Sequence, residues 1–282
     1  MIRSIDGLRG RLSEARALAP GPARVALVST MGALHAGHVD LVERARERAD
    51  LVVVSLFVNP LRFATTAEFE EYPRTPDEDA RLLASLGVDV VFAPERAELL
   101  PRGFDTTRVT AGDLGLRYEG RTRPFYFDGL LTAEAKLLQL VRPDVAVYGE
   151  RDLQRVFLVR RMVRDLFLDV EVDAVPTVRG GDDLPVSSRV ALLSDRDRRA
   201  AALIPLALEA AAANADRGVD ACIAAAQSSL MGEPGIALDY LVVVDPATFL
   251  PVDSDHRGRA HALIAASVGG HRFIDNTEIS LG

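Results

Sequence analysis

The chain has 282 residues, enough for one large domain or two modest ones. Apolar residues make up 48% of it, sufficient for a substantial core, and the formal net charge of −8 argues against nucleic-acid and membrane partners, which select a basic surface. The one cysteine, Cys222, excludes an internal disulfide and a cysteine-based zinc site. Because the sequence shows no secretory signal pattern and no apolar run of membrane-spanning length, we expect a cytoplasmic protein that handles a small molecule.

Apolar, strand-like runs alternate with helical patterns over the first two-thirds of the chain. The predicted strands are 25–29, 51–58, 88–94, 145–149 and 170–178, and the helices between them are 38–49, 75–87 and 152–166. In the helix over 75–87, Thr75 is the expected N-cap and Pro76 the first helical residue. Continuous apolar runs are typical of parallel strands covered on both faces. The alternation therefore predicts an α/β fold built on a doubly wound parallel sheet.

The pattern changes after residues 180–185. Alanine-rich helices are predicted over 195–214 and 218–231, followed by strands over 238–245, 260–268 and 271–279. Helices followed by consecutive strands indicate a smaller α+β domain. We therefore expect a first domain over 1–176 and a C-terminal domain over 177–282.

Polar segments follow four of the predicted strands, at the ends where ligands bind in doubly wound sheets. They are STMGALHAGH (29–38), NPLRF (59–63), GERDLQR (149–155) and VSSR (186–189). Although they are far apart in sequence, we expect them to converge on one crevice. A further segment, YEGRTRPFYFDG (118–129), is interpreted as a functional loop or lid.

The first polar segment places His35 and His38 among glycines at a strand-to-helix turn. A helix N-terminus offers unpaired N–H groups and positive partial charge to a phosphate, and Gly32 and Gly37 allow close approach. The histidines can donate hydrogen bonds to charge that builds on an α-phosphate. The structural alternative is a pair of surface histidines at the start of a helix.

The other polar segments carry groups suited to the same ligand. Ser187 and Ser188 supply hydroxyls and Arg189 a guanidinium for phosphate oxygens, while Arg151 and Asp152 could hold phosphate and ribose or metal. Taken singly, these are also consistent with an ordinary turn and an ordinary helix start. Their joint placement at successive strand ends favours a nucleotide site.

Motifs along nearly the whole chain resemble the pantothenate synthetase family. They are TMGALHAGH, FVNPLRF, EYPRTPDED, GVDVVFAP, EGRTRP, AKLLQLVRPDVAVYGERD, VRRMVRDL, VPTVR, SSR, LDYLVVVDP and IDN. The resemblance implies a Rossmann-like fold of the HxGH nucleotidyltransferase superfamily. It also implies an ATP-dependent, AMP-forming ligase that adenylates a small acid such as pantoate and couples it to an amine such as β-alanine. Mg²⁺ is expected to accompany ATP with no metal site on the protein, and the chain is expected to form a homodimer.

The resemblance also assigns roles residue by residue. The catalytic residues are expected to be His35, His38, Arg151, Ser187, Ser188 and Arg189. ATP is expected to contact Thr30, Met31, Gly32, His38, Gly149, Asp152, Val178, Ser187, Ser188 and Arg189. The acid is expected to contact Met31, Asn59, Arg62, Tyr126, Gln154 and Arg155.

Departures from the family pattern gather around the expected acid pocket. Arg62 and Arg155 stand where the family has glutamines that grip pantoate, Tyr126 replaces a histidine and Ser29 a proline; Ala64, Arg151 and Val190 differ as well. Glutamine donates and accepts, whereas arginine only donates and carries a fixed charge. Two buried guanidiniums repel each other unless an anion lies between them. We therefore hypothesise an acid more anionic than pantoate. The alternative is that the arginines turn outward or pair with Glu68, Glu70 or Asp128, leaving pantoate acceptable.

Two other functions are compatible with the motifs. A simple nucleotidyltransferase would use the same histidines but yield a nucleotidylated product instead of free AMP. A non-catalytic paralogue would bind a nucleotide or metabolite as a sensor. The C-terminal domain and the length of the resemblance argue against the first, and the retained histidines and Ser-Ser-Arg motif argue against the second.

Overall fold

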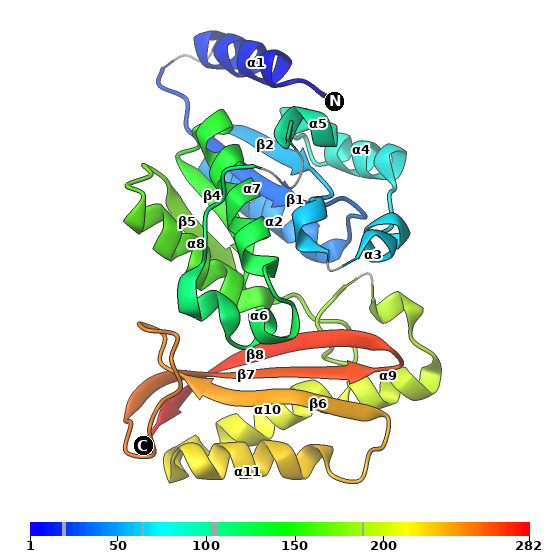
Figure 1. Cartoon of the computed structure of the whole chain (residues 1–282), viewed down its shortest axis with the longest axis vertical. Helices are drawn as coiled ribbons and strands as arrows, with labels where there is room; N and C mark the ends of the chain where they lie inside the picture. Colours follow the sequence, from blue (N-terminus) through cyan, green and yellow to red (C-terminus); the bar gives the residue numbers. More distant parts are fainter. Residues whose placement is uncertain (19–20, 64, 103–105, 188) are drawn as a thin grey trace. The chain divides into compact units, whose positions relative to one another are not determined.

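The computed structural model describes residues 1–18, 21–63, 65–102, 106–187 and 189–282. The chain divides into two compact units, both drawn in Figure 1. The first comprises Met1–Glu150 and Arg155–Pro176, and the second comprises Arg151–Gln154 and Thr177–Gly282. Among the described residues, no helix is both long and apolar enough to cross a bilayer.

A five-stranded parallel sheet forms the centre of the first unit. Its strands are β1 (Val25–Thr30), β2 (Leu51–Leu56), β3 (Val90–Phe92), β4 (Val145–Gly149) and β5 (Glu171–Val175), in the order β3-β2-β1-β4-β5. The predicted α/β class is confirmed. The last strand is shorter than expected and ends at Val175, because Pro176 has no N–H to continue the ladder. The strand order reverses between β1 and β4, the position where such sheets bind ligands.

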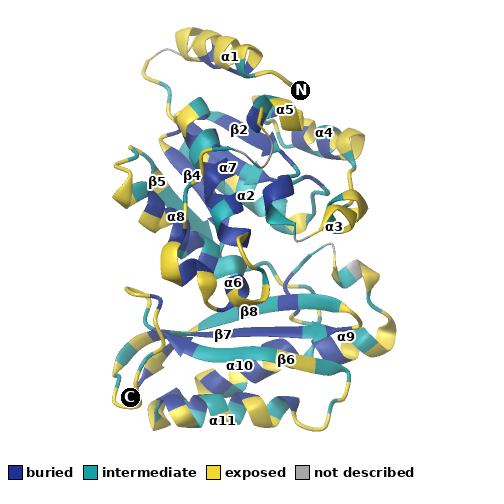
Figure 2. Ribbon diagram, viewed as in Figure 1, coloured by how far each residue is buried: buried dark blue, intermediate teal, exposed yellow. Residues whose placement is uncertain are grey.

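Helices cover both faces of this sheet. They are α1 (Ile5–Leu18), α2 (Ala36–Arg48), α3 (Thr66–Glu71), α4 (Pro76–Ser85), α5 (Arg96–Leu99), α6 (Glu119–Thr122), α7 (Tyr126–Val141) and α8 (Leu153–Asp165), with short 3₁₀ turns η1 (Pro60–Arg62), η2 (Gly112–Leu116) and η3 (Glu150–Asp152). On one face, Val42 and Ala45 of α2 and Leu83 of α4 pack against the alternate apolar residues of β1, β2 and β4. On the other face lies α7, which hydrogen-bonds to β1 and β4. Figure 2 shows the dark, buried strands at the centre of the unit.

The segment 118–129 is not the open loop that its composition indicated. Residues 119–122 form α6, and α7 begins at Tyr126. Two residues of left-handed backbone, Tyr118 at φ 51° and Phe125 at φ 63°, precede these helices. A Cβ on Gly120 would lie 1.7 Å from the carbonyl oxygen of Gly115, so this compact turn requires glycine.

Gly129 is a second point of close approach, where α7 meets η1. A Cβ there would lie 2.3 Å from the carbonyl oxygen of Leu61. We expect Gly129→Ala to lower the free energy of unfolding by about 1–3 kcal/mol through overpacking. Gly10→Ala is the matched control, because Gly10 also lies inside a helix but has nothing within 4 Å of a new Cβ. Gly10→Ala should raise the free energy of unfolding, measured in urea, by up to about 1 kcal/mol. Equal effects from the two variants would contradict the packing argument.

The second unit contains an antiparallel sheet with helices against one face. Its strands β6 (Ile236–Val244), β7 (Gly258–Val268) and β8 (His271–Leu281) lie in sequence order. Helices α10 (Leu203–Ala213) and α11 (Val219–Leu230) share one core with β7, and buried Cys222 belongs to it. The helix expected over 195–214 is instead two, α9 (Asp195–Ala201) and α10, separated at Ala202. Pro205 explains the break, because it cannot donate to the carbonyl four residues earlier.

Candidate active site

His35 and His38 form the start of α2 as a reciprocal cap. His35 is the N-cap, and its Nδ1 accepts from the backbone N–H of Gly37 at 3.2 Å. The Nδ1 of His38 accepts from the backbone N–H of His35 at 3.2 Å, and the ring centroids lie 4.1 Å apart. A ring nitrogen that accepts carries no proton, so the proton of each neutral imidazole lies on Nε2. The two rings therefore present Nε2–H donors at the N-terminus of a helix, the pairing suited to a phosphate.

A buried carboxylate holds the loop before these histidines. Asp79 of α4 is 4% exposed and accepts from the backbone N–H groups of Ala33 at 3.0 Å and Leu34 at 2.9 Å. Thr75 is the N-cap residue of α4, as predicted, but its hydroxyl donates to the same carboxylate and accepts no hydrogen bond from the helix backbone. Gly32 has φ +81°, and a Cβ there would lie 2.9 Å from Asp79 Oδ2. The conformation of the loop thus depends on Gly32 and Asp79 together.

We expect Asp79→Ala to lower the free energy of unfolding by about 3 kcal/mol, because two backbone donors lose a charged acceptor. Asp77→Ala is the matched control, since Asp77 is an exposed acid in the first turn of the same helix. The measurement is urea unfolding of both variants. A similar, small loss in each would mean that Asp79 acts only through the helix dipole.

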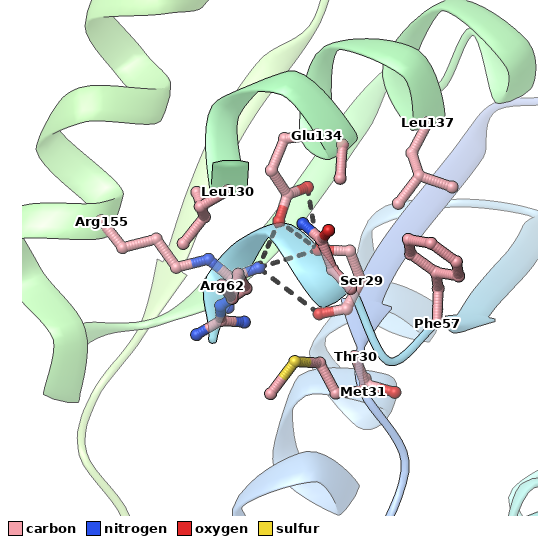
Figure 3. A pocket seen from close by; sticks show the side chains of 11 residues that line it. Ser29, Thr30, Met31, Phe57, Arg62, Leu130, Glu134, Leu137 and Arg155 are labelled. Atoms are coloured by element: carbon pink, nitrogen blue, oxygen red, sulfur yellow. Dashed lines mark hydrogen bonds and ion pairs between the residues drawn. The ribbon is translucent and has the colours of Figure 1, made fainter. Parts of the chain in front are cut away.

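A pocket opens beside the carboxyl end of β1. It has an empty volume of about 300 Å³ that includes its open mouth. Its lining is Ser29, Thr30, Met31, Phe57, Asn59, Arg62, Leu130, Ala133, Glu134, Leu137 and Arg155, all in the first unit. Figure 3 shows these side chains coming from the end of β1 and the residue after it, from the segment after β2, and from η1, α7 and α8. Polar and charged side chains alternate with apolar ones in this lining, a mixture that suits a small organic acid.

Glu134 is the centre of a buried polar cluster in this pocket. It accepts from Ser29 Oγ at 2.7 Å and from Arg155 Nη2 at 2.5 Å, and Arg155 also donates to Ser29 Oγ at 2.8 Å (Figure 3). Tyr148 donates its hydroxyl to Glu134 at 3.2 Å. Burial, together with the charge of Glu134, raises the pKa of the Tyr148 phenol well above its ordinary value, so the phenol stays protonated and donates.

Arg62 lies at the other polar end of the pocket, beside Tyr126. Its guanidinium lies 4.8 Å from the centre of the Tyr126 ring and hydrogen-bonds to the Tyr126 hydroxyl. Arg123 lies 4.2 Å from the same ring and pairs with Glu68. The Nε of Arg62 is a buried donor to which no described residue offers an acceptor. Asn59, also expected to contact the acid, donates to the Gly129 carbonyl at 2.9 Å and caps η1, so it holds this wall in place.

The remaining site candidates lie in the second unit, where Arg151 joins three segments. Its Nη1 donates to the carbonyl of Val186 at 3.0 Å, and its own carbonyl accepts from Asn276 at 3.2 Å. Val186 in turn donates its N–H to Val178 at 2.9 Å. Ser187, which is half-buried, directly follows Val186. Arg151 is therefore a support for the Ser187 loop as well as a candidate phosphate ligand.

An ion pair with a buried carboxylate anchors the same loop to β8. Arg179 donates to both carboxylate oxygens of Asp275, at 2.8 and 3.0 Å. Burial raises the pKa of the Asp275 carboxyl, and the hydrogen bonds from Arg179 act in the opposite direction. Asp275 and Asn276 belong to the IDN motif, so that motif connects the last strand to Arg179 and to Arg151.

The sequence comparison decides the family. The family model for Pantoate-beta-alanine ligase matches residues 1–278. The chain belongs to the pantoate-beta-alanine ligase family. The resemblance inferred from the motifs is confirmed.

Individual members of this family match over most of their length. A pantothenate synthetase from Leifsonia xyli is 48% identical over 281 residues, covering 99% of this chain and 98% of that protein. One from Acidothermus cellulolyticus is 49% identical, and the match covers 95% of this chain and 88% of that protein. The crystal structure of pantothenate synthetase from Thermus thermophilus superimposes with a TM-score of 0.90 at 41% identity, covering 99% of each chain. That of the Francisella tularensis ligase, complexed with beta-gamma ATP and beta-alanine, superimposes with a TM-score of 0.78 at 30% identity, covering 98% and 97%.

The structure brings some of the family's candidate residues together and leaves others untested. Met31, Asn59, Arg62 and Arg155 line one pocket, with Tyr126 against Arg62. Thr30 is buried and donates to the Ser55 carbonyl at 2.9 Å. Arg151, Asp152, Gln154, Val178, Ser187 and Arg189 belong to the second unit, and their meeting with the histidines stays a prediction. Ser188 and Ala64 lie outside the described residues.

Two residues of the site escaped the sequence reasoning. Asp79 is one of three acids in the first turn of α4, a pattern that by itself indicates only a favourable helix start, and Glu134 lies within the apolar-rich pattern of α7. A charged residue among the apolar positions of a buried helix is the signal that could have identified Glu134. Arg155 pairs with a local acid, as the alternative expected, but that acid is Glu134. Of the acids named there, Glu68 pairs with Arg123, and Asp128 accepts from the N–H of Ala111. Among the described residues, no group of three or more His, Cys, Asp or Glu is placed to hold a metal.

Proposed function

We propose that this protein is an ATP-dependent, AMP-forming ligase that joins pantoate to β-alanine. The observation that carries the proposal is the reciprocal cap of His35 and His38, whose accepting Nδ1 atoms leave the ring protons on Nε2, in a member of the pantoate-beta-alanine ligase family. The relative from Francisella tularensis was crystallised with an ATP analogue and β-alanine, which supports the choice of substrates.

The proposed reaction has two steps. A carboxylate oxygen of the acid attacks the α-phosphorus of ATP, forming an acyl–phosphate bond while the bond to pyrophosphate breaks. His35 and His38 stabilise the negative charge that builds on the α-phosphate oxygens. The amine then attacks the acyl carbon, the amide forms, AMP leaves with the electron pair and the amine loses a proton. No covalent bond to the protein is required.

The second unit supplies the other proposed ATP ligands. Arg151, Ser187, Ser188 and Arg189 are assigned to the phosphates, with Asp152 and Val178 on the nucleoside side. Gly149, the last residue of β4 in the first unit, is assigned to the nucleoside as well. Mg²⁺ enters with ATP, held by phosphate oxygens and water, which is how this ion commonly binds nucleotides. We further propose that the ligase is a cytoplasmic homodimer whose two domains divide near residue 177.

The test is a product balance with purified protein, ATP, Mg²⁺, pantoate and β-alanine. We expect AMP, pyrophosphate and pantothenate in equal amounts, and no ADP. Formation of ADP would contradict adenylation. A nucleotidylated product without free AMP would favour a simple nucleotidyltransferase, and tight ATP binding with no turnover would favour a non-catalytic paralogue.

A further inference from the structure

The net charge of the acid pocket is not determined by its two arginines alone. Three of its lining residues are ionisable: Arg62, Arg155 and Glu134. The other lining residues are neutral, so the lining has a net charge of about +1 with all three ionised. The Glu134 carboxylate contacts the guanidinium of Arg155 and is buried, because the Glu134 side chain is only 6% exposed.

Three donors converge on the Glu134 carboxylate. Ser29, Tyr148 and Arg155 all donate to its carboxylate, and hydrogen bonds to an anion stabilise that anion. Ser29 closes a triangle by accepting from Arg155 while donating to Glu134. The charge of Arg155 is thus compensated by the protein itself, before any substrate binds.

We propose that Glu134 is a specificity-determining residue that restricts the acid substrate to a monoanion. The proposal rests on the proposed ligase activity and defines its acid. With Arg155 compensated, Arg62 is the one lining cation that a substrate carboxylate has to neutralise. A second carboxylate on the substrate would approach Glu134 at close range in a poorly solvated pocket, where like charges repel strongly. The hypothesis of a more anionic acid, drawn from the two arginines, is replaced by this one.

A matched pair of acids tests the proposal. Pantoate and 3,3-dimethylmalate share one carbon skeleton, and the malate bears a carboxylate in place of the terminal hydroxymethyl group, so it is a dianion at pH 8. We would measure kcat/KM for pyrophosphate release with each acid at saturating ATP and β-alanine. Wild-type protein should prefer pantoate at least tenfold. Glu134→Gln keeps the size and an acceptor oxygen but removes the charge, and should shift the ratio toward the malate at least tenfold.

The ratio of two acids on one enzyme is insensitive to the fraction of protein that is folded, so a loss of stability in the variant does not obscure the result. Glu70→Gln is the control, because it makes the same charge change at an exposed position of α3 outside the pocket lining, and its ratio should stay at the wild-type value. An unchanged ratio in Glu134→Gln, or a wild-type preference for the malate, overturns the proposal.

Thermal stabilisation by each acid in the presence of ATP gives the same ratio without turnover. Suppose that neither acid supports pyrophosphate release, that only pantoate stabilises the wild type, and that the malate stabilises Glu134→Gln more than it stabilises the wild type. The ligase proposal then fails, and the charge assignment holds. If both acids are turned over with the same ratio in all three proteins, the ligase proposal holds and the charge assignment fails.

Discussion

Replacing His35 by asparagine is expected to lower the rate of pyrophosphate release about 10²- to 10³-fold, the loss typical when one preorganised donor to a developing anion is removed. Asparagine is a good N-cap, so this change keeps the start of α2 while removing the Nε2–H of the ring. The effect should fall mainly on kcat, because the donor is strongest toward charge that builds in the transition state.

The thermal midpoint of His35→Asn serves as the control for folding and should lie close to that of the wild type. His35→Ala, by contrast, loses the cap as well, and should also lower the free energy of unfolding by about 1 kcal/mol. A His35→Asn enzyme with near wild-type kcat would remove this histidine from the proposed mechanism, whatever the stability of either variant.

Arg155→Met is expected to lower the free energy of unfolding by about 3–5 kcal/mol, because it leaves the Glu134 carboxylate buried without its counter-ion. The pair is well shielded, with side chains 18% and 6% exposed. Ser29 and Tyr148 continue to donate to Glu134 in this variant, which places the expected loss toward the lower end of the range. Urea unfolding measures the change.

The double variant Glu134→Gln, Arg155→Met should recover most of that loss, since no charge then remains buried in the cluster. A double-mutant cycle with both single variants isolates the coupling between the two residues. If Arg155→Met cost less than about 1 kcal/mol and the cycle showed no coupling, the pair would behave as a solvated surface ion pair. The charge count behind the monoanion proposal would then be wrong.

Local patterns were sufficient for the elements with strong and regular signals. The five apolar runs predicted a parallel sheet because strands buried on both faces need apolar side chains at every position. Prediction was weaker where the local backbone depends on a distant contact. The segment 118–129 is rich in glycine, arginine and aromatic residues, yet it is largely helical, since Gly120 allows contact with Gly115 and α7 packs onto η1 through Gly129.

The sequence by itself determined the family, the class of fold and the position of His35 and His38, because these depend on short motifs and on hydrophobic periodicity. It also located the unusual arginines, Arg62 and Arg155. Only the tertiary structure decided what those arginines do. Glu134 is 21 residues from Arg155 along the chain, and no local pattern links them. The packing of α7 and α8 beside β1 places their charges 2.5 Å apart, and in a buried pocket that distance determines the charge a substrate meets.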